Sequence, residues 1–98
     1  MSYRLTFEPE AEAEIDEASR WYADQNEELG AAFLRAVEAS LAAILENPFQ
    51  YQIVHGRKRR VALLRFPYRL IYVVSGEEIN VIGCMHGRRH PRHWEERD

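Results

Sequence analysis

Apolar side chains at helical spacing run through residues 9–46, and this pattern ends at Asn47-Pro48. Pro48 disfavours helical conformation at Asn47 and lacks the N–H that a continuing helix would need. Beyond it, the chain changes to short runs in which apolar and polar residues alternate, as in β-strands. A change from a helical period to a strand period predicts an α+β domain.

Two helices separated by a polar break are predicted before Asn47. The first starts at Pro9, whose missing N–H costs nothing in the first turn, and the break falls at residues 24–26. The second starts near Glu27 or Glu28. With so short a link, the pair forms an antiparallel αα-hairpin. The apolar stripes consist of Ala11, Ile15, Ala18 and Tyr22 in the first helix and Leu29, Phe33, Val37, Leu41 and Ile44 in the second.

The strands are predicted on either side of this hairpin. One short strand covers residues 3–7, and three more cover 61–66, 68–74 and 79–85, while residues 49–56 form a loop or a poorly formed edge. The order is β-α-α-β-β-β: an N-terminal strand, an α-helical hairpin, and then a C-terminal three-stranded antiparallel meander. We expect the helices to cover one face of this sheet, and residues 1–98 to form a single domain.

Size and composition are those of a small soluble protein. A chain of 98 residues buries roughly 60–70% of its unfolded surface, which is enough for one core. The single cysteine, Cys84, excludes an intrachain disulfide and fits a reducing compartment. The longest apolar runs, residues 41–45 and 70–74, are too short for a membrane span or a signal peptide. These features predict a cytoplasmic protein.

Charge is divided unequally along the chain. Residues 1–50 contain 3 Arg and 11 Asp or Glu, a balance of −8, while residues 51–98 contain 10 Lys or Arg and 5 Asp or Glu, a balance of +5. The basic residues gather in two tight runs, around residues 57–60 and 88–92. Such asymmetry indicates an anionic partner for the second half, and would also suit direct contact with nucleic acid. The alternative is ordinary surface charge that keeps the protein soluble.

The basic residues of the second half are the candidate binding residues. Alternation along a strand predicts that Arg57 and Arg59 lie on one face, and Lys58 and Arg60 on the other. If the strands form a meander, the C-terminal arginines join part of this set. The alternative is a solvated sheet edge, where lysine and arginine deter aggregation. The candidates are Arg57, Arg59, Arg60, Arg65, Arg69, Arg88, Arg89, Arg92 and Trp94.

Three histidines near the C-terminus, His86, His90 and His93, superficially resemble a metal site. Pro91 interrupts any helix through them, and the flanking arginines would repel a divalent cation, so no metal is expected. A histidine could also act as a general acid or base. However, no tyrosine follows Tyr72 to act as a second proton-transfer group. We therefore expect no catalytic residues and no cofactor.

The remaining aromatic and acidic residues have simpler interpretations. Trp21 and Tyr22 are expected to pack within the helical part. Trp94 either clamps the C-terminal segment onto the sheet or contacts a partner. The glutamates of the first helix are expected to form a solvated face.

Several segments resemble the ParE branch of the RelE/ParE toxin superfamily, whose members are also called plasmid stabilisation proteins. They are PEAEAEIDEASRWY at 9–22, ENP at 46–48, RFPYRLIYVV at 65–74 and HGRRHPRHW at 86–94, and the resemblance extends over residues 3–94. It implies a bacterial toxin of a type II toxin-antitoxin system, neutralised by a cognate antitoxin. ParE-like members act on DNA gyrase, whereas RelE-like members cleave mRNA on the ribosome. Because the RelE-type C-terminal tyrosine is missing, the resemblance favours gyrase inhibition by binding.

Two alternatives stay open. In a ribosome-dependent endoribonuclease, His86 would move protons, Arg65 would be part of the active site, and Arg57, Lys58, Arg59 and Arg69 would hold phosphates with it. In a non-toxic module, the chain would bind an antitoxin and do nothing more. An antitoxin complex is expected under all three hypotheses.

Overall fold

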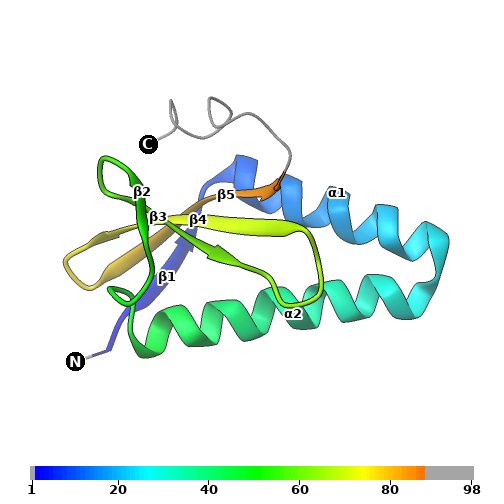
Figure 1. The fold of residues 1–98 in the computed structure, drawn as a ribbon, viewed down its shortest axis with the longest axis horizontal. Coiled ribbons are helices and arrows are strands. Elements are labelled where there is room, and N and C mark those ends of the chain that lie inside the picture. The colour runs from blue at the N-terminus through cyan, green and yellow to red at the C-terminus, as the bar shows by residue number, and fades with distance from the viewer. Residues whose placement is uncertain (1, 88–98) are drawn as a thin grey trace.

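The computed structural model describes residues 2–87, which form an αα-hairpin packed on one face of a five-stranded sheet (Figure 1). The sheet order is β1-β5-β4-β3-β2, in which β1 is parallel to β5 and the other pairs are antiparallel. This arrangement confirms the α+β prediction. The elements are β1 (Arg4–Phe7), α1 (Pro9–Gln25), α2 (Glu27–Glu46), β2 (Ile53–His55), β3 (Lys58–Ala62), β4 (Tyr68–Ser75) and β5 (Glu78–His86).

The strand boundaries around β3 differ from the prediction. The basic run does not precede the strand, because β3 begins at Lys58 and ends at Ala62 instead of covering 61–66. After Ala62 the chain turns, since the Leu63 amide donates to the Tyr68 carbonyl at 2.9 Å and Arg65 has a φ of 73°. Residues 49–56, predicted to be a loop or a poorly formed edge strand, contain the three-residue strand β2, which pairs with β3 with a register shift.

Asparagine residues define the helix ends. Asn26 is the single residue between the helices: its amide donates to the Tyr22 carbonyl at 3.0 Å, and its side chain accepts from the Glu28 amide at 2.8 Å. It therefore ends α1 and caps α2. Asn47 follows α2, and its side chain accepts from the Phe49 amide at 3.3 Å. The predicted break and the predicted stop at Pro48 are both confirmed.

The main core lies between the helices and the sheet. Phe33 and Ile44 of α2 are fully buried against Leu70 and Tyr72 of β4, with Val81 of β5 beside them. At one end, an aromatic cluster contains Tyr22, Phe33, Phe66 and Tyr68. The prediction for Tyr22 is thus confirmed. Trp21 was predicted wrongly: it is 58% exposed and contacts only the edge of Tyr22 among the described rings, at 5.1 Å between centroids.

The sheet face opposite the helices, the outer face, has a smaller apolar cluster. Ile71, Ile82 and Met85 are buried there, with Val54 and Val73 packed against them. Ile82 occupies a β-bulge, because Ile71 pairs with Gly83 while Tyr72 pairs with Val81.

The two helices approach most closely at Gly30. A Cβ at this position would lie 2.7 Å from Ala23 Cβ and 3.0 Å from the Ser19 carbonyl oxygen, both in α1. Contacts this short require the helices to separate, so a residue without a side chain sets their spacing.

The hydroxyl of Tyr72 joins the end of α2 to the centre of the sheet. It donates to the Pro48 carbonyl at 2.6 Å and is fully buried. Burial raises the pKa of Tyr72 to about 12, partly offset by the nearby positive charge of Arg59.

We predict that Gly30→Ala lowers the free energy of unfolding by up to about 2 kcal/mol, since overpacking costs about 1–3 kcal/mol and the higher helix propensity of alanine offsets about 1 kcal/mol. Urea denaturation of the purified protein measures this change. The double variant Ala23→Gly/Gly30→Ala removes the contact with Ala23 Cβ but keeps the 3.0 Å contact with the Ser19 carbonyl oxygen. Its new helical glycine costs about 1 kcal/mol, so it should recover little of the loss. A Gly30→Ala protein that is more stable than the parent would show that a methyl group fits between α1 and α2, and would contradict the prediction.

We predict that Tyr72→Phe lowers the free energy of unfolding by about 1–2 kcal/mol at pH 8, because the buried Pro48 carbonyl loses its donor. The folded-state pKa is raised from 10.0 to about 12. The contribution of the neutral hydroxyl is therefore complete below pH 10 and is lost as the pH rises to about 12. Urea denaturation at several pH values should show the two proteins converging over this range. A constant difference would contradict the assignment.

Candidate binding surface

The outer face of the sheet carries part of the predicted basic set. Arg60 pairs with the buried outer-face residue Ile71, and Arg69 pairs with both Ala62 and Met85. Because directly paired residues project to the same side of a sheet, these arginines border the outer apolar cluster. Lys58 lies on the same side, two residues before Arg60. The prediction that Lys58 and Arg60 share a face agrees with this register.

Arg59 points to the helix side and has an internal role. Its Nη1 donates to the carbonyls of Tyr51 at 2.7 Å and Phe49 at 3.3 Å, and its guanidinium lies 5.2 Å from the centre of the Phe49 ring. It therefore anchors the segment after α2 to β3. Its predicted contact with a partner remains a prediction.

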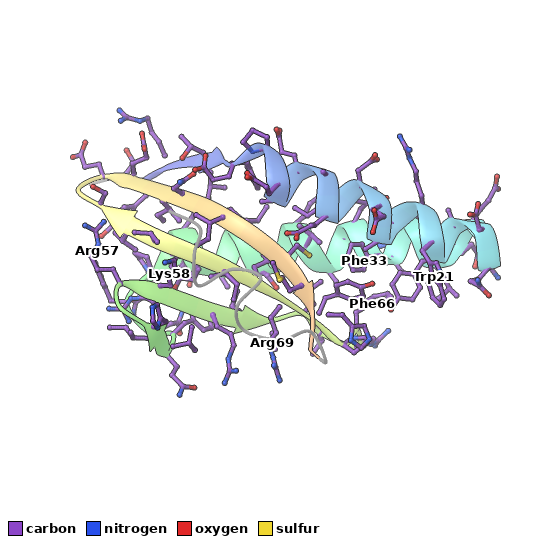
Figure 2. The ribbon with its side chains drawn as sticks, turned by 90° about the horizontal axis from the view of Figure 1, so that it is seen from above. Trp21, Phe33, Arg57, Lys58, Phe66 and Arg69 are labelled. Carbon is purple, nitrogen blue, oxygen red and sulfur yellow. The ribbon has the colours of Figure 1, made fainter. Side chains whose placement is uncertain are left out.

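Arg57 and Lys58 lie at the other end of the sheet from Arg69, as Figure 2 shows. Together with Ser75, Glu78 and Asn80 they line a shallow cleft beside the β4–β5 turn. Arg57 Nη2 donates to the Val74 carbonyl at 3.4 Å. Lys58 and Ala62 are four residues apart in a strand, a distance of about 13 Å. The basic residues of the outer face therefore form a stripe and not one compact patch.

The turn between β3 and β4 presents Leu64 and Arg65. Leu64 is 75% exposed, and Arg65 adopts the left-handed backbone conformation that costs a non-glycine residue of the order of 1 kcal/mol. Beside this turn, a groove of about 460 Å³ runs between α2 and the edge of β3. Small residues of α2 form one wall. The groove is lined by Ala36, Ala39, Ser40, Ala43, Tyr51, Val61, Ala62, Leu63 and Leu64.

His86 lies on the helix side of the sheet, away from Arg60 and Arg69. It pairs with Tyr68, and the two rings make an edge contact at 5.2 Å between centroids. Both residues line a groove of about 550 Å³ between α1 and the end of β5. The structure therefore does not place His86 with the outer-face arginines, as a shared nuclease site would require.

Glu14 was predicted wrongly as part of a solvated face. Its Oε1 accepts from the Cys84 amide at 2.9 Å, which joins α1 to β5. Position 14 lies three residues after Ala11 and four before Ala18, both buried, so its place on the apolar stripe was a usable signal. Burial and the charge of Glu14 raise the pKa of the Cys84 thiol to about 12, so this cysteine is unreactive at neutral pH.

The candidates Arg88, Arg89, Arg92 and Trp94 lie outside the described residues, as do His90 and His93. The chain reaches them from Gly87, whose amide donates to the Pro67 carbonyl at 2.7 Å. A Cβ at Gly87 would lie 3.7 Å from Arg69 Cζ, so the C-terminal segment begins beside Arg69, as expected for a meander.

Within residues 2–87, no three His, Cys, Asp or Glu side chains gather in a group that could hold a metal ion. Neither α1 nor α2 has the length and apolar composition needed to cross a membrane.

Comparison with known proteins gives a match to one family model and to several solved structures. The search of curated proteins found no match. Among solved structures, the chain is similar to one described as the chromosomal ParDE TA system from P. aeruginosa, with a TM-score of 0.71, 18% identity, and coverage of 87% of this chain and 96% of that one. At this identity the similarity shows the fold. The family model of the ParE toxin of the type II toxin-antitoxin system parDE matches residues 5–91, and the chain therefore belongs to the ParE toxin family.

Proposed function

We propose that this ParE-family toxin inhibits DNA gyrase by binding it, and that a cognate antitoxin neutralises it in the cytoplasm. The observation that carries the proposal is the family match over residues 5–91. The ParE branch acts on gyrase and performs no nuclease chemistry. No tyrosine follows Tyr72, so the tyrosine expected of the RelE branch is missing.

The positions of the basic residues support binding over catalysis. Arg60 and Arg69 border the outer face, whereas His86 lies in a groove on the helix side whose described lining contains no arginine or lysine. A ribonuclease needs its proton-transfer group and its phosphate-binding cations around one scissile bond. We assign gyrase contact to the outer-face residues Lys58, Arg60 and Arg69, together with Arg88, Arg89, Arg92 and Trp94. Arginine suits this role because it binds carboxylates and phosphates bidentately.

We assign antitoxin docking to the groove between α2 and β3. The Arg60 amide donates outward to the Gln52 carbonyl at 3.1 Å, so the backbone of Ala62, two residues on, faces the same edge. The β2 pairing covers Lys58 and Arg59, and the Gln52 carbonyl takes the Arg60 amide, so the edge that the described chain leaves available to a further strand begins at Ala62. An extended antitoxin segment could add to it and place apolar side chains beside Leu64.

Charge supports an acidic antitoxin segment. Ala62 lies between Arg60, two residues earlier, and Arg69, its partner on β4. Carboxylates of an added strand would pair with these arginines along the outer face. Antitoxin binding would then cover part of the surface assigned to gyrase, which explains neutralisation by competition.

We predict that expression without antitoxin arrests growth and produces double-strand DNA breaks while mRNA stays intact. Growth, plasmid supercoiling and transcript integrity are followed after induction in the same culture. Expression of His86→Ala should arrest growth equally, because the histidine takes no part. Fragmented mRNA with intact DNA, abolished by His86→Ala, would instead establish the endoribonuclease. Absence of arrest at every expression level would leave only an antitoxin-binding module.

We predict that Arg69→Glu weakens binding of the antitoxin from the same operon about tenfold, because it places like charges at the docking edge. Isothermal titration with the purified antitoxin measures the dissociation constant. Arg20→Glu is the matched control: it reverses one charge on α1, where Arg20 is bound to Asp16, away from the docking groove. Equal affinities for Arg69→Glu and the parent would remove the docking assignment.

A further inference from the structure

The groove beside His86 has a composition unlike the rest of the binding surface. The carboxylates of Glu14 and Glu17 and the rings of Trp21, Tyr22 and Tyr68 line its volume of about 550 Å³. No arginine or lysine is among its described lining residues. The groove therefore combines negative charge with aromatic surface.

This combination binds cations. A guanidinium group pairs with carboxylates and stacks on aromatic rings, most strongly on tryptophan. Trp21 lines the groove and is 58% exposed, so its ring is accessible to a cation there. The nearby cation of α1, Arg20, is bound to Asp16 at 2.9 Å and is not among the lining residues.

The described part of the chain ends beside this groove, one residue before Arg88. His86 and Pro67 line it, and the Gly87 amide donates to the Pro67 carbonyl at 2.7 Å. The next two residues are Arg88 and Arg89, and Arg92 follows shortly after. A side chain tethered this closely has an effective concentration in the millimolar range or above, so even a weak contact would be populated.

We propose that the groove binds an arginine side chain of residues 88–92 of the same chain, through Glu14, Glu17 and Trp21. The docked arginine orients the C-terminal segment from its first residues. Its consequence for toxicity rests on the proposed function, which assigns gyrase contact to the same arginines. The groove then sets how many of them are free to bind the target at any moment.

Limited digestion of the full chain with trypsin tests this docking, because trypsin cleaves after arginines that are free to enter its active site. At low salt, Glu17→Gln should raise the initial rate of cleavage after Arg88, Arg89 and Arg92 about threefold. Glu17→Gln/Trp21→Ala should raise it about tenfold. Mass spectrometry identifies the products. In 1 M salt the parent should approach the rate of Glu17→Gln, because the Debye length falls to about 3 Å.

Glu12→Gln is the matched control, since it removes one charge from the same helix at a residue outside this groove. It should be cleaved at the parent's rate. Glu17 and Trp21 are surface residues, and circular dichroism confirms that both variants remain folded. Unchanged cleavage in the double variant would overturn the proposal, and so would equal acceleration by Glu12→Gln. Digestion requires neither gyrase nor antitoxin, so its outcome does not depend on the proposed function.

Discussion

The packing of two helices on one face of the sheet determines which surfaces are left for binding. Gly30 lets α1 and α2 approach so closely that a Cβ there would lie 2.7 Å from Ala23 Cβ. The hairpin packs on the sheet face that carries Val61, Tyr72 and Val81, so it leaves the outer face and the Ala62 edge of β3 uncovered. Arg60, Arg69 and Leu64 belong to these uncovered regions. The proposed binding surfaces therefore follow from how the core is built.

Much of the fold could be predicted because its signals are local. Pro9, Asn26 and Pro48 define the helices through backbone chemistry, and apolar spacing gives their buried faces. The end of β3 was missed because it depends on the turn at Arg65, whose φ of 73° has no signal in a residue type that rarely adopts it. The parallel placement of β1 beside β5 joins distant segments, which local spacing cannot specify.

The candidate site was less predictable, since a charged side chain does not reveal its partner. Arg59 belongs to the same basic run as Arg60, yet it donates to two backbone carbonyls on the helix side while Arg60 lies on the outer face. Glu14 resembles its neighbouring glutamates in sequence, but it bonds to the Cys84 amide. Trp21 is exposed because Tyr22 occupies the core-facing position of that turn, where it stacks on Phe33. Each outcome depends on tertiary neighbours.

The fold places the acidic and basic halves of the chain in different structural elements. The acidic half forms α1 and α2, and the basic half supplies β3, β4 and the segment after Gly87. β5 lies against α1, and its last residue, His86, lines the same groove as Glu14 and Glu17; the sequence continues from there to Arg88, Arg89 and Arg92. In the docking proposed above, these opposite charges attract within the molecule before any partner arrives. A target or antitoxin that binds these arginines must therefore attract them more strongly than Glu14 and Glu17 of α1 do. This favours a partner with a high density of carboxylates or phosphates.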